Sequence, residues 1–501
     1  MRRALWVVGI LALLLIAGYF IAVARVRKKI ETALHTLPPG YSITYTSLHL
    51  RLLNGAFSLD DVHVRGNGQD GSIHELKVEG IRYAALLHHR LQVRAIRLDG
   101  CSVDIGEGSA KMVKPEVTLP FTAMSVEKVE IGGLRITGSK QRVSVEGEVK
   151  LDSLALDSGK WSVGGVYLLA RRIKSVIPGS DEAVTMDGVM LDSKKGVLRM
   201  DTVRVRPTEN KEEIGKRRGY QVDVMDALSE GIVVEGLDVM RLMRKQFVAD
   251  RISVRKNDIY VFRDRRLPLK AGEKPLPVEG LESLPVTLRV GSVSLGSTFF
   301  EYEEYPKLGK ETGKLKIYRL HGTLEPLINH PRAGDPAFLT MTMHGSLMNS
   351  GTVTATTKLP LRKGDPYKVE GAFHELDVTS LNNPAENLGH LHLESGMLNS
   401  LDFRFDMTDE GSTGQIVGEY HDLVVDKLKE KSDEKKVDKV KSFALKKFII
   451  PRNKDKSLAV RKRTGKVKYK RDRERYFSYY MLHSLLVGVK SSFTLGFLLP
   501  G

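Results

Sequence analysis

Apolar and polar side chains alternate along most of this chain of 501 residues. The stretch SLHLRLLNGAFSLDDVHV, residues 47–64, is the first clear example, and Asn54-Gly55 lies at its centre. An Asn-Gly pair is typical of a two-residue type I′ hairpin turn, because both residues tolerate a positive φ. Folding about this turn predicts one apolar and one polar face, with Leu52 opposite Phe57, Leu50 opposite Leu59, Leu48 opposite Asp61, Arg51 opposite Ser58 and His49 opposite Asp60.

The alternation continues for several hundred residues. In HELKVEGIRY (74–83) it slips by one position at Gly80, and in LQVRAIRLDGCSVDI (91–105) it slips twice. A turn or a β-bulge has this effect on a period of two. Comparable short strands are predicted in SVEKVEIGGLRITG, QRVSVEGEVKLDSLAL, GVLRMDTVRVRP, LPVTLRVGSVSLG, KLKIYRLHGTL, FLTMTMHGSL and GTVTATTKLPL.

Helical periodicity is rare by comparison. The clear candidates are LDVMRLMRKQ (237–246) and the C-terminal YFSYYMLHSLLVGVK (476–490). The segments 206–219 and 265–285 are rich in turn residues, and we interpret them as long surface loops between strands. The part of the chain after the N-terminal region is therefore predicted to be mainly β, mostly an antiparallel meander.

An uncharged apolar run, Ala4 to Ala24, precedes the strands. Its 21 residues are enough for a helix to cross a hydrocarbon core of about 30 Å, so it predicts a transmembrane helix. The alternative is a cleaved signal peptide, since Ala22-Val23-Ala24 has the small-x-small form of a cleavage site. Basic residues flank the run on both sides, and their count leans slightly toward a cytoplasmic location for the bulk of the chain.

The charge of the chain is concentrated in one segment. The formal net charge is +17, and residues 426–475 hold 21 Lys and Arg against 8 Asp and Glu. Cys101 is the only cysteine, which excludes an intramolecular disulfide. Within 452–475 only Tyr469 could stack on a base, so nucleic acid is not the expected partner. We expect attraction to anionic lipid head groups, the alternative being a solvated tail; the membrane-surface residues are Arg461, Lys462, Arg463, Lys466, Lys468, Lys470 and Arg471.

Candidate catalytic motifs are incomplete. GKETGKLK (309–316) has three residues between its glycines instead of four, and Leu315 stands where a phosphate loop needs Ser or Thr. Ser125 and Lys128 fit S-x-x-K without companion motifs, and the acidic run EYEE (301–304) is typical of solvated strand ends. We predict no enzymatic activity and no cofactor.

One arrangement has the spacing of metal ligands. In HLHLE, His390, His392 and Glu394 share a strand face, because strand side chains repeat every two residues. A fourth ligand is not visible, so a polar strand face that happens to hold two imidazoles is the preferred interpretation, and no metal is predicted.

Several segments resemble the AsmA-like superfamily. They are the single apolar run followed by ITYTSLHLRLLNGAFSLDDVHVRG, the unit LQVRAIRLDGCSVDI, and GAFHELDVTSLNNPAENLGHLHLESGMLNSLDFRFDMTDEGSTGQIVGEYHDLVVDKL. In the last, the resemblance rests on Leu376-Asp377, Leu381-Asn382, Ser395-Gly396, Leu398, Gly418, Tyr420 and Asp422-Leu423. The ending RYFSYYMLHSLLVGVKSS is similar to the tail of short members. The chain differs from the large members in its shorter length and in lacking their terminal domain.

The resemblance implies an elongated open β-groove whose apolar face shields lipid, anchored in the inner membrane with its bulk in the periplasm. We give this more weight than the nearly balanced charge count. The expected organisation is a cytoplasmic N-terminus (1–3), a transmembrane helix (4–24), a basic and proline-containing linker (25–40), a β-groove domain (41–425), a basic segment (426–475) and an apolar C-terminal helix with its tail (476–501). The groove-lining residues are Leu48, Leu50, Leu52, Phe57, Leu59, Val62, Val64, Leu91, Val93, Ile96 and Leu98.

The expected function is therefore to shield or carry phospholipid, or another acyl lipid, between the inner and outer membranes in envelope biogenesis. A long meander with one apolar face must cover that face with a second sheet, with itself or with something else apolar, and acyl chains would serve. The alternative is a closed β-sandwich that acts as an assembly factor, binding envelope protein partners without lipid cargo.

Overall fold

The computed structural model describes residues 23–28, 31–32, 41–66, 69–86, 88–105, 122–138, 143–157, 160–176, 179–429, 435–444 and 460–492. These residues are mainly β, as predicted. They belong to two compact units, one formed by Met1–Pro178 with Thr185–Leu198 and the other by Gly179–Val184 with Arg199–Gly501. The chain passes between the units three times, just before β11 (Glu182–Asp192), within β11, and within β12 (Val197–Pro207).

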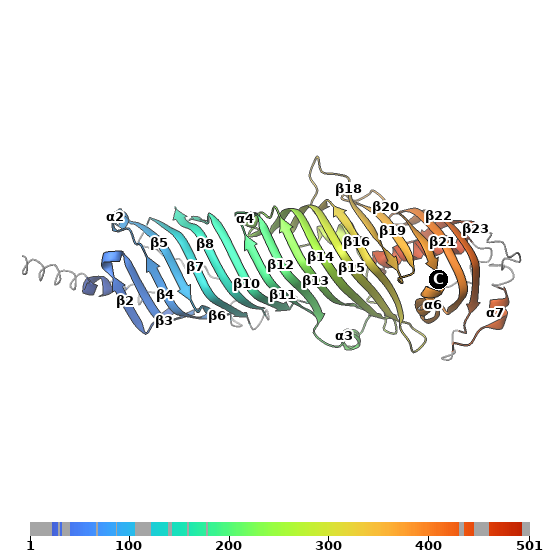
Figure 1. The fold of residues 1–501 in the computed structure, drawn as a ribbon, viewed down its shortest axis with the longest axis horizontal. Coiled ribbons are helices and arrows are strands. Elements are labelled where there is room, and N and C mark those ends of the chain that lie inside the picture. Colours follow the sequence, from blue (N-terminus) through green and yellow to red (C-terminus); the bar gives the residue numbers. More distant parts are fainter. Residues whose placement is uncertain are drawn as a thin grey trace, which may run out of the picture. The chain divides into compact units, whose positions relative to one another are not determined.

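The first unit is a sheet in which β3 and β4 form a hairpin near the end that carries β1 and β2 (Figure 1). Strands β1 and β2 both pair with β3, β4 pairs with β5 and β6, and β8 pairs with β7, β9 and β10, all antiparallel. Only β7 runs parallel to its neighbours β5 and β6 among the described pairs of this unit. Its elements are β1 (Tyr41–Thr44), β2 (Ser47–Arg51), η1 (Leu52–Asn54), β3 (Ala56–Gly66), β4 (Gln69–Glu79), α2 (Tyr83–Leu86), β5 (Arg90–Asp99), β6 (Ser102–Ile105), β7 (Ala123–Gly138), β8 (Val143–Asp157), β9 (Lys160–Ser162) and β10 (Gly165–Val176).

The second unit continues the meander from β13 to β23 in chain order, with the two-residue β17 beside β15 (Figure 1). Its strands are β13 (Asp223–Glu235), β14 (Gln246–Asp264), β15 (Thr287–Tyr305), β16 (Gly313–Glu325), β17 (Leu327–Ile328), β18 (Phe338–Leu347), β19 (Gly351–Pro360), β20 (Tyr367–Asp377), β21 (Leu391–Met407), β22 (Gly411–Lys427) and β23 (Arg461–Lys470). Its helices are α3 (Lys211–Arg218), α4 (Val239–Leu242), α5 (Pro277–Glu282), η2 (Val378–Leu381), α6 (Asn382–Gly389), α7 (Lys439–Ala444) and α8 (Phe477–Ser491).

One pair in the second unit departs from the predicted antiparallel meander. Strands β14 and β15 are parallel over their whole length, from Gln246 beside Thr287 to Asp264 beside Tyr305. Adjacent parallel strands need a connection that returns to the starting end of the sheet. The segment 265–286 makes this return and contains α5, so the predicted surface loop 265–285 is a crossover. The other predicted loop, 206–219, contains the helix α3, whose first turn is capped by Asn210.

The opening hairpin forms, but its predicted register is wrong by two residues. Leu50 lies opposite Phe57 and Leu48 opposite Leu59, while Leu52 belongs to the connection. That connection is a turn of 3₁₀-helix closed by Gly55, which alone has a positive φ of 57°. A type I′ turn needs a positive φ at both central residues, and Asn54 does not provide one. A register shift of two residues keeps every side chain on the same face of the sheet, so the predicted apolar face is retained.

Bends occur where the alternation slips, as predicted. Gly80 and Gly100 have φ values of 70° and 64°, and β4 ends just before the first of them. A side chain on Gly133 would stand 3.3 Å from the backbone of Gly100, so the two neighbouring strands bend together at positions that favour glycine.

The predicted helices have mixed outcomes. The C-terminal helix is confirmed as α8, whereas the segment 237–246 forms only the four-residue α4, capped by Asp238. The predicted basic segment 426–475 contains β23 and α7. The predicted transmembrane run lies outside the described residues except for its last two, which begin the helical stretch 23–28. Among the described residues no helix combines the length and the apolar character needed to span a membrane.

Candidate apolar binding face

In the first unit, cross-strand pairing aligns apolar side chains into two rows that each span seven strands. Residues directly opposite each other on neighbouring strands project from the same face of a sheet. The first row is Leu50, Phe57, Val78, Ile96, Val129, Leu151 and Val166, and the second is Leu48, Leu59, Leu76, Leu98, Ile131, Val149 and Leu168.

Most of the predicted groove residues lie on this face. Leu48, Leu59 and Val62 form one buried cluster with Leu50 and Val64 against it, and Val93 belongs to a second cluster with Phe57, Leu91, Ile96 and Leu98 packed around it. The exception is Leu52, because the corrected register places it in η1. The predicted apolar face is therefore present except at Leu52, and its role as a lipid groove stays a prediction.

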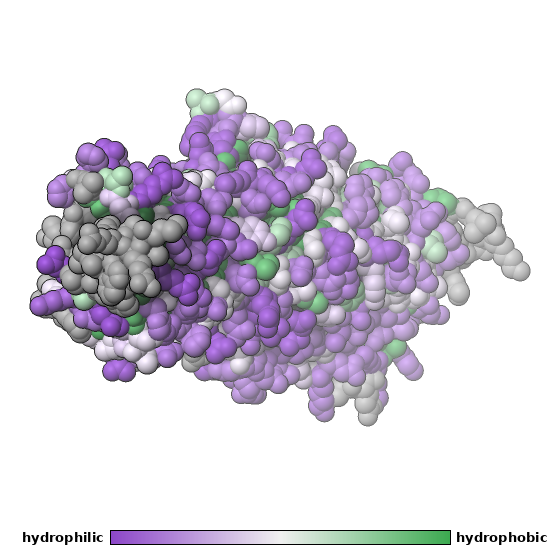
Figure 2. All heavy atoms as spheres, turned by 60° about the vertical axis from the view of Figure 1, so that its left-hand side comes forward, coloured by the Kyte–Doolittle hydropathy of each residue, from purple (hydrophilic) through white to green (hydrophobic). Residues whose placement is uncertain are grey.

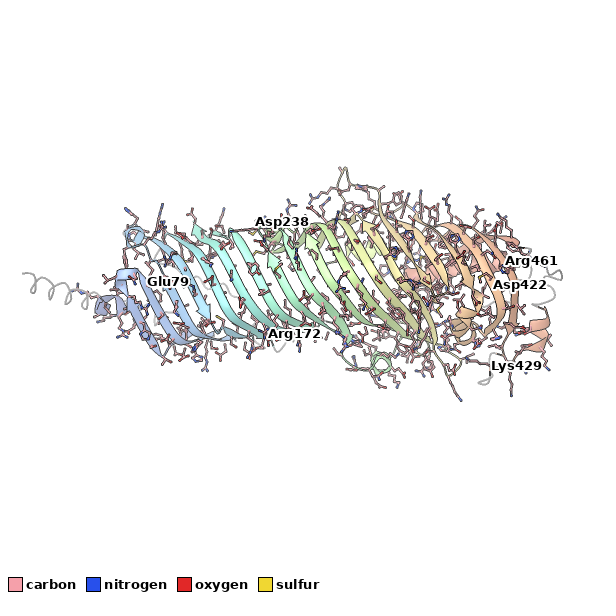
Figure 3. All side chains as sticks on the ribbon, in the orientation of Figure 1. Glu79, Arg172, Asp238, Asp422, Lys429 and Arg461 are labelled. Atoms are coloured by element: carbon pink, nitrogen blue, oxygen red, sulfur yellow. The ribbon has the colours of Figure 1, made fainter. Side chains whose placement is uncertain are left out.

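The opposite face of the first unit carries ion pairs. Arg97 on β5 contacts Glu130 at 2.8 Å and Glu79 at 2.9 Å, and Arg172 on β10 contacts Asp187 at 2.6 Å. Glu79 and Arg172 are labelled in Figure 3. These pairs are partly exposed and contribute little to stability, but their charges keep that face hydrated. Hydrophilic side chains likewise dominate the surface visible in Figure 2.

The second unit repeats the arrangement over ten strands, β13–β16 and β18–β23. Each residue of a row is paired with its neighbour on the next strand. One row is Val234, Ile252, Val293, Leu324, Met341, Thr357, Val369, Phe405, Gly414 and Val467. The other is Ile232, Val254, Leu295, Gly322, Met343, Ala355, Gly371, Phe403, Ile416 and Gly465.

Burial varies along these rows, and at their β13 end Val234 and Ile232 are 2% and 6% exposed. From β14 to β18 the apolar members, such as Val254, Leu295 and Met343, are only partly buried. From β20 to β23 they enter a buried cluster of ten residues, in which Phe405 and Ile416 are 2% and 1% exposed. The apolar face of the second unit is thus buried at β13 and from β20 to β23, and partly exposed between them, from β14 to β18.

Helix α8 provides much of that cover (Figure 1). Tyr480 is 1% exposed and donates its hydroxyl to the carbonyl of Thr408 at 3.2 Å. Ser484 meets Ser412 of β22 with 2.7 Å between the hydroxyl oxygens. The crossover adds Leu276 and Val278 to the same cluster, and the amide of Val278 donates to the hydroxyl of Tyr367. Burial raises the pKa of Tyr367 and of Tyr480 to about 12.

A hydrogen-bonded polar group is buried in the same strands, β13 to β15, outside the two rows. Asn257 is 4% exposed; its amide oxygen accepts from Ser229 at 2.7 Å and its nitrogen donates to Thr298 at 2.9 Å. Nothing in the local pattern predicts this group, because its members lie 28 and 41 residues from Asn257.

The predicted membrane-surface residues do not behave alike. Lys462, Lys466, Lys468 and Lys470 are exposed along one face of β23. Arg461, labelled in Figure 3, and Arg463 alternate with them and are partly buried. Arg471 is buried, pairs with Asp409, and donates to the carbonyl of Lys274 at 2.6 Å. Its partners make it part of the packing between the crossover and the chain that leads into α8, so it does not join the exposed lysines.

The histidine pattern HLHLE does not assemble a shared site. His390 caps the end of α6 with a φ of 53°, and His392 contacts Glu386 at 2.7 Å. Within the described part of the chain, no group of three or more His, Cys, Asp or Glu side chains could hold a metal ion. The carboxylates of Glu301 and Glu303 face lysines, with Lys211 at 2.6 Å from Glu303.

Comparison with known proteins adds no family assignment. No protein-family model matches the chain, and no curated protein matches it.

Proposed function

We propose that this chain shields or transports an acyl lipid, most simply phospholipid, on the apolar face of an open β-groove. The observation that carries the proposal is the partial exposure of the apolar rows from β14 to β18. An extended apolar surface is costly to leave in water, and a row of aliphatic and methionine side chains matches the shape and polarity of an acyl chain. The resemblance to AsmA-like proteins supports the same function.

The membrane context is also part of the proposal. An N-terminal anchor in the inner membrane with the bulk in the periplasm would place the groove between two membranes, in the service of envelope biogenesis. The exposed lysines of β23 support contact with an anionic membrane surface, since each basic residue near such a surface contributes about 1 kcal/mol. Reporter fusions test the periplasmic location, and vesicles with and without anionic lipid test the contact made by the lysines.

The alternative is an assembly factor that binds envelope proteins and carries no lipid. The covered end of the second unit favours it, because α8 and α5 show that the chain can bury its own apolar face. The two functions differ in what contacts the exposed part of the rows, which is lipid in the first and protein in the second.

Site-specific photo-crosslinking separates them. A benzophenone amino acid replaces Met343, on an apolar row, or its neighbour His344, which is exposed. In gently solubilised full-length protein, the proposal expects lipid adducts at 343 in large excess over 344, identified by mass spectrometry. Protein adducts at 343 with no lipid would favour the assembly factor, and equal lipid labelling at both positions would refute a specific groove.

A further inference from the structure

One edge of the sheet in the first unit is formed by three connections: η1, the β4–β5 segment that contains α2, and the β8–β9 hairpin (Figure 1). They lie at the same edge because β5 and β7 are parallel and begin there, while β8 is antiparallel to β7 and ends there.

This edge carries most of the exposed apolar side chains of the unit. In the described part of the first unit, four large apolar side chains are exposed. Leu53 (86% exposed), Tyr83 (49%) and Trp161 (58%) lie on or next to the three connections, and Leu169 (42%) lies within β10. Single exposed apolar side chains are normal, so it is their concentration at one edge that indicates an interaction surface.

Hydrogen bonds of the backbone hold two of these side chains in place. In η1 the amide of Gly55 donates to the carbonyl of Leu52 at 3.0 Å, and the carbonyl of Gly55 accepts from the amide of Ile81 at 2.8 Å. The hydroxyl of Tyr83 donates to the same carbonyl of Leu52 at 2.5 Å and so joins α2 to η1. Turning Leu53 inward would break these contacts, so its exposure follows from the fold.

Trp161 is connected to the same edge through a row of paired residues. Leu91, Met124, Leu156 and Trp161 lie opposite one another across β5, β7, β8 and β9. The first three are partly buried, and three steps between strands span about 14 Å. Next to this row the amide of Arg82 donates to the carbonyl of Gln92 at 3.0 Å, which brings Tyr83 beside Leu91. The exposed side chains therefore lie along one apolar margin of the sheet.

The charge along this margin is mainly positive. In the segments 51–56, 80–90 and 157–161, the exposed charged side chains described are the cations Arg51, Arg82, Arg90 and Lys160 and the carboxylate Asp157. Glu127 offsets one of the cations, because its carboxylate accepts from Arg82 at 3.0 Å. The core of a protein–protein interface is depleted of charge, whereas here cations alternate with the apolar side chains.

We propose that this edge of the first unit contacts a lipid bilayer with anionic head groups, and that Leu53, Tyr83 and Trp161 enter the head-group zone. Tyrosine and tryptophan suit this zone because each has an apolar ring and a polar group. The cations between them attract anionic head groups. This surface differs from the lysine face of β23, and the contact does not require that the protein carries lipid.

The fluorescence of Trp161 tests the contact at one position. The chain has two tryptophans, so Trp6→Phe leaves Trp161 alone. The full-length variant, held in peptidiscs, is mixed with vesicles of phosphatidylcholine and phosphatidylglycerol whose acyl chains carry bromine, a contact quencher. We expect at least twofold quenching and a shift of the emission to shorter wavelength.

A tryptophan at the opposite edge is the positional control. Arg65→Trp, combined with Trp6→Phe and Trp161→Phe, places the only indole at an exposed position near the other end of β3. Its emission should not change. A second pair of variants keeps Trp161 as the probe: Leu53→Ser should reduce the quenching at least twofold, whereas Leu169→Ser, which removes an exposed leucine away from the edge, should leave it unchanged.

Three results would overturn the inference. Absence of quenching at Trp161 would leave a protein as the partner of this edge. Equal quenching at positions 161 and 65 would show adsorption without a preferred edge. Equal quenching by vesicles of phosphatidylcholine alone would exclude a role for the cations. Photo-crosslinking at Met343 reports on lipid cargo separately, so the proposed function and this inference can fail independently.

Discussion

Gly465 on β23 and Gly488 on α8 lie in direct backbone contact. A side-chain carbon on Gly465 would overlap the carbonyl oxygen of Gly488, and one on Gly488 would stand 2.9 Å from Val467 and 3.0 Å from Ile416. Only glycine at both positions allows the helix to lie so close to the sheet. This contact fixes how deeply α8 covers the apolar rows.

The contact predicts that Gly465→Ala displaces α8. Overpacking at a close approach costs about 1–3 kcal/mol, so amide exchange should accelerate from Tyr480 to Ser484. Gly280→Ala is the matched control, since nothing lies within 4 Å of the added carbon in α5. Unchanged exchange in α8 would mean that the helix tolerates the shift.

A second prediction separates the two faces of β14. Val254 lies on an apolar row and Ser253 on the opposite face, next to each other in the chain. In an open groove, Val254→Glu should leave the protein folded and reduce its bound lipid severalfold, because water can reach a partly exposed carboxylate. Ser253→Glu should change neither.

Lipid content and protease resistance are measured side by side on these two variants. Loss of folded protein in Val254→Glu alone would favour a closed interior, where an unpaired carboxylate costs several kcal/mol against a total stability of about 5–15 kcal/mol. A folded variant with its full lipid content would remove Val254 from the binding face.

The sequence predicted the faces of the strands better than the contacts between them. The apolar side of residues 47–64 was predicted correctly although the partner of Leu50 was not. Strand side chains alternate between the two faces, so a register shift of two residues leaves each side chain on its predicted face. The same period of two in KLKIYRLHGTL and FLTMTMHGSL could have identified Leu324 and Met341 as row members.

Contacts between distant residues could not be predicted in this way. Strands β14 and β15 are parallel, whereas a meander would make them antiparallel. The alternation of apolar and polar residues within a strand is the same whether its neighbour is parallel or antiparallel, so it could not predict this pairing. The packing of Ser484 on Ser412 joins residues 72 apart.

A third prediction concerns Arg471 and Arg473, which share the carboxylate of Asp409 but differ in burial. The side chain of Arg471 is 4% exposed and that of Arg473 is 48% exposed. Arg471→Gln should destabilise the protein by about 1–3 kcal/mol, because it removes the charged donor from the carbonyl of Lys274, while the half-exposed Asp409 keeps its contact with Arg473. Arg473→Gln should cost about 0–1 kcal/mol, as for other exposed pairs.

Denaturant unfolding of both variants tests the difference. Exchange of the Lys274 amide, which donates to the carbonyl of Arg473 at 2.7 Å, reports whether the crossover loosens from the chain before α8. Equal effects of the two substitutions would contradict the importance of burial at Arg471.

The last prediction concerns alkaline pH and the cover of the apolar face. Tyr480 and Tyr367 have pKa values raised to about 12, chiefly by burial, from an ordinary value of 10.0. An acid whose folded pKa is raised stabilises the fold fully below its unfolded pKa, and that stabilisation is lost as the pH rises through the folded pKa. The covered end should therefore be stable up to about pH 10 and lose about 3 kcal/mol per tyrosine by pH 12.

Tyr480→Phe should remove the part of this alkaline loss of stability that Tyr480 contributes, although it also removes the hydrogen bond to Thr408. Urea midpoints at pH 8, 10 and 11.5 measure the effect, with Tyr83→Phe, at an exposed tyrosine, as the control. The same alkaline loss in wild type and Tyr480→Phe would exclude ionisation of Tyr480 as its cause.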